Sequence, residues 1–178
     1  MVFSSPRNVI HYVDDQAGFV HACECLMKEP FIGFDVETTL RGKPPRVCLM
    51  QVATPAGDTW LFDNAGIEDM TPFAEVLQNE TIVKVIHNAM FEKLVMRQYG
   101  VSIVNVFYTL TVSRRLRKDV EGGHSLKAVC KRELDMDINK KYQCSNWARR
   151  PLSSEQIAYA ALDAEVLVTL YEIFRKEL

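Results

Sequence analysis

The order of apolar segments along the chain constrains its fold more than any other feature of the sequence. Three strand-like runs follow one another closely at residues 31–38, 47–53 and 59–63, and the turn residues 55–58 separate the last two. After these runs, helical and strand-like patterns alternate to the end of the chain. This order predicts an α/β fold with a mixed central sheet flanked by helices.

The remaining elements are predicted from hydrophobic periodicity and from start and stop signals. Further strands are expected at residues 8–13, 82–87 and 103–107, with a turn at 40–45. Helices are expected at residues 14–28, 71–79, 88–99, 109–118, 125–134 and 153–176. The last helix has the strongest start signal, because Ser153 and Gln156 form a capping-box pattern and Leu152 and Ile157 can pack as a hydrophobic staple.

Length and composition are those of an ordinary globular domain. The 178 residues suit one domain, expected over residues 1–178, and 48% of them are hydrophobic and 25% charged. No apolar run reaches the roughly 18 residues that a membrane span needs, and no secretory signal is visible. Five scattered cysteines argue against a disulfide framework. We therefore expect an intracellular protein of the cytoplasm that makes no membrane contact.

Two acids share one face of the first long strand. Alternation places Asp35 and Glu37 on one face, opposite the apolar residues Ile32, Phe34 and Val36. Two carboxylates at this spacing repel each other unless a cation lies between them, and hard oxygen ligands suit Mg²⁺ or Mn²⁺. Asp35 and Glu37 are therefore candidate metal ligands, and a solvated edge strand is the alternative.

The last predicted helix carries another acid in an apolar setting. Tyr159 and Asp163 are four residues apart and share a helix face. Their neighbours are small and apolar, which would let the helix approach the sheet closely: Ala158, Ala160 and Ala161. A carboxylate buried there needs a partner, because burying an unpaired charge is costly. The alternative is a tyrosine in the core and an acid on the surface.

A third polar group follows the strand at residues 82–87. His87 ends that strand, and Asn88 and Glu92 lie four residues apart on one face of the next helix. Backbone amides at a helix N-terminus can help to hold a phosphate group. The apolar residues of this helix are expected to face the core: Phe91, Leu94 and Val95. The alternative is that Asn88 caps the helix and Glu92 is a solvated acid.

In this order, the three groups resemble the exonuclease motifs of the DEDD superfamily, in its tyrosine-bearing subgroup. The motifs are Phe-Asp-Val-Glu-Thr, His-Asn-x-x-Phe-acid and Tyr-x-x-x-Asp. The chain is similar to ribonuclease D and to the Werner-helicase exonuclease domain, and residues 48–53 and 147–163 extend the similarity over nearly its whole length. The resemblance implies a ribonuclease-H-like fold and 3′–5′ exonuclease activity.

The resemblance also implies roles for single residues. Asp35, Glu37, Glu92 and Asp163 would hold two Mg²⁺ or Mn²⁺ ions that clamp the scissile phosphate, and Tyr159 would position the attacking water. Nucleoside 5′-monophosphates would be released from single-stranded 3′ ends, with RNA favoured over DNA. The residues expected to contact substrate are Thr38, Leu40, His87 and Asn88. Among them, the apolar side chain of Leu40 would wedge against the last base.

Two positions depart from the family pattern. Glu92 stands where the family has Asp, so its carboxylate sits one methylene further out, although a metal-bound water can absorb that shift. Tyr108 stands where many relatives have Asp, outside the ligand set. An alternative is therefore an exonuclease fold that binds nucleic acid but has weakened or lost catalysis. A Rossmann enzyme or small-molecule kinase is disfavoured because no glycine-rich phosphate loop is present.

Charge alone does not indicate a nucleic-acid-binding protein, because the net charge is −2. Basic residues of the second half could guide a strand backbone, with a solvated face as the alternative for each: Arg114, Arg115, Arg117, Lys118, Lys127, Lys131, Arg132, Lys140, Lys141, Arg149 and Arg150. From the position of the last predicted helix we expect no added helical nucleic-acid-binding domain after it. We therefore expect substrate capture by this domain itself, by a homo-oligomer or by a partner.

Overall fold

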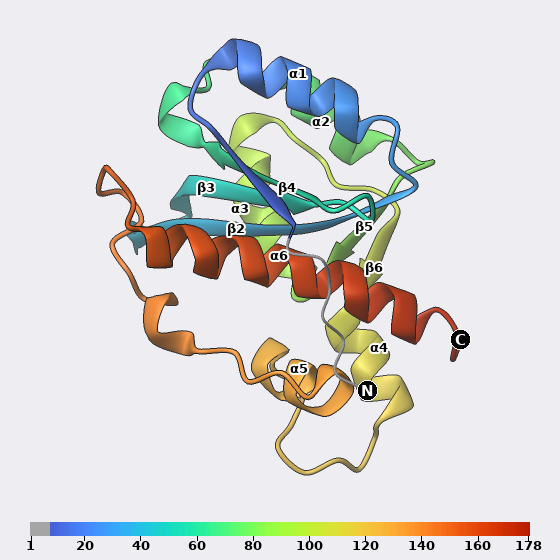
Figure 1. The fold of residues 1–178 in the computed structure, drawn as a ribbon. Coiled ribbons are helices and arrows are strands. Elements are labelled where there is room, and N and C mark those ends of the chain that lie inside the picture. The colour runs from blue at the N-terminus through green and yellow to red at the C-terminus, as the bar shows by residue number, and fades with distance from the viewer. Residues whose placement is uncertain (1–7) are drawn as a thin grey trace.

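A six-stranded mixed sheet forms the centre of the computed structural model, which describes residues 8–178 (Figure 1). The strands are β1 (Val9–Val13), β2 (Phe31–Gly42), β3 (Pro45–Ala53), β4 (Asp58–Asp63), β5 (Val83–Ile86) and β6 (Val106–Tyr108). Their order across the sheet is β1-β4-β3-β2-β5-β6. β2, β3 and β4 are antiparallel neighbours, whereas β1 pairs with β4, β5 with β2, and β6 with β5 in parallel. The predicted mixed sheet is confirmed.

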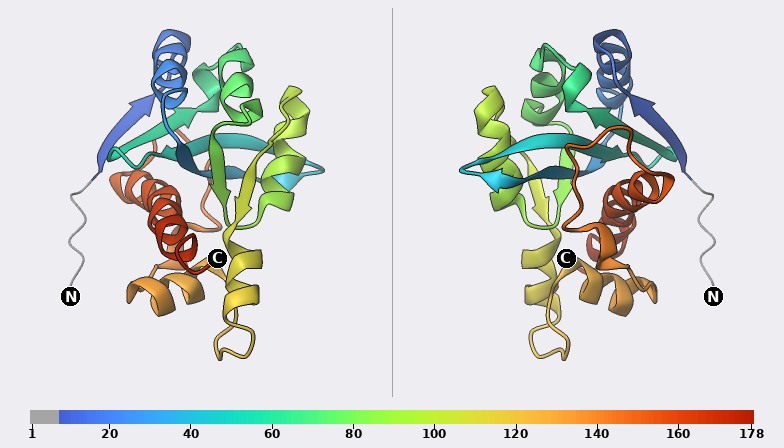
Figure 2. Two further views of the ribbon diagram at one scale, coloured as in Figure 1. Left: turned by 90° about the vertical axis from the view of Figure 1, so that its right-hand side faces the viewer. Right: turned by 90° about the vertical axis from the view of Figure 1, so that its left-hand side faces the viewer.

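Helices cover both faces of this sheet, as Figures 1 and 2 show. The main hydrophobic core lies between the sheet and three helices: α1 (Gln16–Leu26), α2 (Thr71–Gln78) and α3 (Ala89–Met96). The opposite face carries α4 (Thr109–Leu116), α5 (Leu126–Leu134) and the long α6 (Ser154–Phe174). Short 3₁₀ turns are η1 (Asn64–Gly66), η2 (Arg97–Tyr99) and η3 (Lys140–Tyr142). None of the helices in residues 8–178 is long and apolar enough to cross a membrane.

Element boundaries differ from the prediction in two places near the polar groups. β2 continues to Gly42 through much of the turn predicted at residues 40–45, because its hairpin with β3 extends that far. The helix predicted at residues 88–99 ends as an α-helix at Met96 and continues as η2. Within this helix Leu94 is 51% exposed, so its predicted place in the core is wrong. Val95, which is also predicted to face the core, is buried, as are Ala89 and Met96.

The long helix α6 begins with the predicted capping box. The Ser153 hydroxyl accepts a hydrogen bond from the Gln156 backbone amide at 3.2 Å, and the Gln156 side chain accepts one from the Ser153 amide at 3.0 Å. These two bonds satisfy amides that a helix start otherwise leaves unpaired. The start of the helix is thereby fixed, and with it the register of the side chains that follow.

Close packing holds α6 directly against the sheet. Gly33 of β2 leaves no room for a side chain, since a Cβ there would lie 2.3 Å from the Ala164 carbonyl oxygen. The hydroxyl of Thr59 on β4 donates a hydrogen bond to Glu165 of α6 at 2.9 Å. Of the small residues predicted to permit a close approach, Ala160 and Ala161 are buried, whereas Ala158 is exposed. The helix face that carries Asp163 is held beside β2.

Candidate active site

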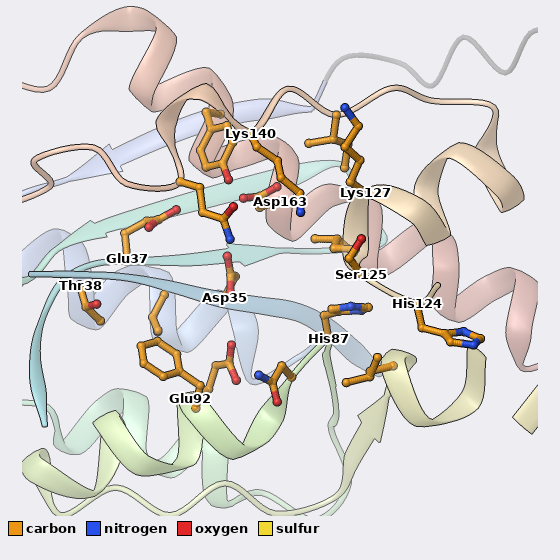
Figure 3. Close-up of a pocket in the computed structure, with 18 of the residues that line it drawn as sticks. Asp35, Glu37, Thr38, His87, Glu92, His124, Ser125, Lys127, Lys140 and Asp163 are labelled. Carbon is orange, nitrogen blue, oxygen red and sulfur yellow. The ribbon is translucent and has the colours of Figure 1, made fainter. Parts of the chain in front are cut away.

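Three carboxylates meet between β2 and α6. Asp35 and Glu37 project from β2 on the side of α6, while their apolar neighbours pack in the main core as predicted: Ile32, Phe34 and Val36. Asp163 projects from α6 towards them (Figure 3). One oxygen from each of the three carboxylates lies within 4.8 Å of the others. The sheet and the helix thus bring together acids that are more than a hundred residues apart in sequence.

A fourth carboxylate approaches from the start of α3. Glu92 is 4% exposed and lines the same pocket, and Figure 3 shows it pointing towards Asp35. Its Oε2 atom is buried without a hydrogen-bond partner among the described residues. Asn88 stands at the helix N-cap, but its side chain makes no capping bond and lines the pocket instead. The alternatives of a solvated acid and an asparagine cap are therefore both wrong.

The four acids share an unfavourable electrostatic environment. None of them forms an ion pair with another residue in the described part of the chain. Burial raises the pKa of Asp35, Glu37, Glu92 and Asp163 above their ordinary values, and the charge of Asp35 raises the pKa of the other three further. Carboxylates held together in this way need protons or cations to offset their repulsion.

Tyr159 lies one helical turn before Asp163 and lines the same pocket. Its ring packs against those of Trp147 and Tyr142, at centroid distances of 6.1 and 6.0 Å. Burial and the charges of Asp163 and Glu37 raise the pKa of the Tyr159 hydroxyl well above its usual range. The phenol therefore keeps its proton at neutral pH and can act as a hydrogen-bond donor.

The carboxylates open into a cavity of about 760 Å³. Three of the four residues predicted to contact substrate line it, namely Thr38, His87 and Asn88. Leu40 does not line this pocket: β2 continues beyond the acids, and Leu40 is 66% exposed on the hairpin. The His87 Nδ1 atom lies 2.9 Å from the Thr109 hydroxyl, and burial lowers the pKa of this imidazole to about 4, so it is neutral near pH 7.

Only part of the predicted basic surface reaches this cavity. Lys140 and Arg114 line it, and Figure 3 shows the amino group of Lys140 directed into it. Lys127 also lines it but forms an ion pair with Asp137 at 3.1 Å. Four others form ion pairs with acids of the fold: Arg117, Lys131, Arg132 and Arg150. The remaining four do not line the cavity: Arg115, Lys118, Lys141 and Arg149.

The second departure from the motif pattern, Tyr108, lies outside the cavity lining. Its hydroxyl accepts a hydrogen bond from the Lys93 amino group at 2.8 Å. Tyr108 occupies the N-cap position of α4 without a side-chain capping bond. An acid at this position would be suited to cap that helix, so the departure concerns helix α4 and not the carboxylate cluster.

Sequence reasoning missed several residues of the cavity wall. Ser125 and Leu126 line it from the start of α5, and Ile138 and Gln143 from the irregular segment before α6. No local sequence pattern marks these residues, because they reach the site only through the tertiary packing of α5 and of the segment between α5 and α6. The glycine pair at residues 122–123 precedes this wall, and Gly123 itself lines the cavity.

A protein-family model described as a 3′–5′ exonuclease matches residues 10–178. The chain belongs to the 3′–5′ exonuclease family. The exosome complex component 10 of Homo sapiens is 35% identical over 171 residues, which are 94% of this chain. Ribonuclease D of Pseudomonas paraeruginosa is 30% identical over 91% of this chain. The family resemblance inferred from the motifs is thereby confirmed.

Solved structures of this exonuclease family share the fold. The catalytic core of RRP6 from Trypanosoma brucei aligns with a TM-score of 0.85 and 25% identity, over 98% of this chain and 50% of that one. The predicted ribonuclease-H-like architecture is therefore confirmed. The chain spans 19% of the human relative and 43% of the Pseudomonas enzyme. The match therefore covers less than half of either relative.

Proposed function

We propose that this chain is a metal-dependent 3′–5′ exonuclease that releases nucleoside 5′-monophosphates from single-stranded ends. The observation that carries the proposal is the convergence of four carboxylates, without a cationic partner in the described residues, at one end of an open cavity. Family membership supplies the direction of attack, and the matched range of residues 10–178 supports one domain over the whole chain.

The donor set fits two Mg²⁺ or Mn²⁺ ions. All candidate ligands are carboxylate oxygens, which both ions prefer. Oxygens on one octahedral Mg²⁺ lie at most about 4.2 Å apart. The ligand oxygens of Asp35, Glu37 and Asp163 lie within 4.8 Å of one another, so binding one ion would bring them closer by no more than about 0.6 Å. The unpartnered Oε2 of Glu92 supports a fourth ligand position. Bound ions would activate water and stabilise the charge of the departing oxygen.

The remaining cavity residues suit an anionic strand. The protonated Tyr159 hydroxyl can orient a water molecule beside Asp163, and neutral His87 can hydrogen-bond substrate without adding charge. Lys140 can contact a backbone phosphate. A cavity of about 760 Å³ lies in the usual range for ligand pockets and has room for the end of a strand and not for a duplex.

RNA is the favoured substrate in this proposal. Its support comes from the relatives, which are named as a ribonuclease and as a component of the exosome complex. Matched RNA and DNA oligomers of equal sequence, each labelled at the 5′ end, would test the preference directly. Faster shortening of the RNA from its 3′ end is expected, with single-nucleotide steps and 5′-monophosphate products.

The exonuclease proposal is tested by Asp35→Asn and Asp163→Asn, which keep side-chain size but remove a ligand charge. Both should abolish shortening of the labelled oligomer in Mg²⁺ and in Mn²⁺. Glu172→Gln is the matched control, because Glu172 is an exposed acid on the same helix as Asp163. Undiminished activity of Asp35→Asn would overturn the proposal.

The alternative, a domain that binds nucleic acid without turnover, rests on Glu92 alone, because Tyr108 lies outside the cavity lining. It predicts oligonucleotide binding with no shortening in any divalent metal. Glu92→Asp distinguishes the two cases further. If the longer side chain impairs catalysis, Glu92→Asp should raise kcat. Glu92→Gln should lower kcat in any wild-type protein that shows activity, because it removes a ligand charge.

A further inference from the structure

Gln51 of β3 is a buried amide whose hydrogen-bonding capacity is unused. Its side chain is 0% exposed, and neither Nε2 nor Oε1 has a hydrogen-bond partner. Among the residues that the structure describes, no other side chain leaves two polar atoms buried in this way. Buried polar groups are almost always hydrogen-bonded, so such an exception calls for an explanation in function.

The strand register places this amide beside the carboxylate cluster. Gln51 lies directly opposite Asp35 in the antiparallel pairing of β2 and β3. Residues opposite each other point to the same face, and their Cβ atoms are about 4.5–5.5 Å apart. Gln51 therefore projects under α6, on the face that carries Asp35. A glutamine side chain can reach a carboxylate across that distance.

The neighbour of Gln51 on the other side of β3 offers its amide no partner. The next residue across the sheet, Leu61 of β4, is apolar and packs with Ala160 and Ala161 of α6. An apolar residue in place of Gln51 would suit these neighbours better and would remove the unsatisfied polar atoms. The amide therefore disfavours the metal-free fold, and the carboxylate beside it is the group that can use its N–H.

We propose that Gln51 is a positioning residue for the metal site: its Nε2 donates a hydrogen bond to the ionised Asp35 carboxylate when that carboxylate holds a metal ion. This inference rests on the proposed function, because it requires Asp35 to be a metal ligand. Groups that hydrogen-bond a metal ligand fix its orientation, and their loss typically weakens metal affinity or activity 10–100-fold. Gln51 does not line the cavity, so it acts through Asp35 and not on substrate.

Gln51→Met tests this inference, because methionine keeps the side-chain length and removes the amide. Calorimetric titration of Mn²⁺ into the substrate-free protein should show an affinity lower by about 10–100-fold. The thermal midpoint of the metal-free protein, measured in EDTA, should be equal to the wild type or higher by about 2–4 °C. Metal affinity is thus expected to fall without a loss of stability, whereas loss of a purely structural residue would lower stability.

Thr59→Val is the matched control. Thr59 is also buried on this face of the sheet, but its hydroxyl is used, because it accepts a hydrogen bond from Asn8 at 3.0 Å and donates one to Glu165 at 2.9 Å. This variant should lower the thermal midpoint and leave Mn²⁺ affinity unchanged.

Unchanged Mn²⁺ affinity in Gln51→Met would overturn the inference, and so would a joint loss of stability and affinity, which indicates a packing role. Those outcomes leave the proposed function intact, provided that the wild type binds Mn²⁺ and shortens RNA. A wild-type protein that fails to bind Mn²⁺ would instead overturn the proposed function and the inference with it.

Discussion

Gly33→Ala should separate the role of α6 in stability from its role in the active site. The added Cβ would lie 2.3 Å from the Ala164 carbonyl oxygen and 3.1 Å from the Leu167 Cβ. Ordinary contact begins at 3.4 Å, so the helix must retreat from β2 by about 1 Å. Such overpacking costs about 1–3 kcal/mol. For a chain of this size, the thermal midpoint should fall by about 2–12 °C.

The retreat should also impair catalysis, because Ala164 follows Asp163 directly. A displacement of about 1 Å between the carboxylates of β2 and α6 can reduce the rate by about 10²-fold. The assay is the shortening of a 5′-labelled RNA oligomer from its 3′ end, performed well below the midpoint of the variant. Circular dichroism at the same temperature gives the folded fraction, so that the loss in kcat/KM is expressed per folded molecule.

Gly18→Ala is the matched control for this substitution. Gly18 lies in α1, on the other side of the sheet, and an added Cβ would meet only side-chain atoms, the nearest being Val13 Cγ1 at 3.2 Å. Alanine is favoured over glycine in a helix by about 1 kcal/mol, which offsets that tight contact. We expect nearly wild-type stability and full activity. A wild-type midpoint and kcat/KM in Gly33→Ala would show that the close approach of α6 to β2 limits neither stability nor activity.

Three further predictions concern the pH dependence of metal binding, the N-terminal cap of α6 and the cavity residue Lys140. Burial raises the pKa of all four carboxyl groups, to about 6 for Asp35, 7 for Asp163, 9 for Glu92 and 10 for Glu37, and metal ligation requires the ionised forms. The increase in thermal midpoint caused by Mg²⁺ should therefore vanish below a pH of about 6 and grow as the pH rises through about 6–10, and a pH-independent increase would contradict this. Ser153→Ala removes half of the capping box, so urea denaturation should show a loss of about 0.5–2 kcal/mol, with kcat unchanged. Lys140→Ala should raise KM more than it lowers kcat, and the slope of log KM against log salt concentration should fall by about 0.7 if one phosphate contact is lost. An unchanged slope would show that Lys140 contacts no phosphate.

The sequence predicts the parts of this site that depend on local periodicity. Alternation along one strand is sufficient to place Asp35 and Glu37 on the same face, because successive side chains of a β-strand point to opposite faces of the sheet. Helical spacing in the same way aligns Tyr159 with Asp163, and the capping box fixes where that helix begins. These predictions hold because each depends on residues that are close in sequence.

Features that depend on tertiary pairing could not be predicted. Lys127 and Lys140 look alike in the sequence, yet Lys127 is partly neutralised by Asp137 while Lys140 points into the cavity. Leu40 follows the acids by only a few residues, but the length of the β2–β3 hairpin decides that it lies away from the cavity. The significance of Gly33 is likewise visible only once α6 lies over it.

Glu92 departs from the family motif in residue type, but metal binding depends on where its oxygen atoms lie. A motif compares residue types, and by that criterion an extra methylene is a defect. Metal binding depends on the positions of the oxygen atoms, and those depend on how the backbone of α3 lies relative to β2. Glu92 is buried in the cavity wall, points towards Asp35 and has an oxygen without a partner. A side chain too long for its place would be expected to turn its carboxylate out to water, which is the cheaper state for a charge. The carboxylate stays inside, and this argues that the wall accommodates glutamate and that the proposed fourth ligand is intact.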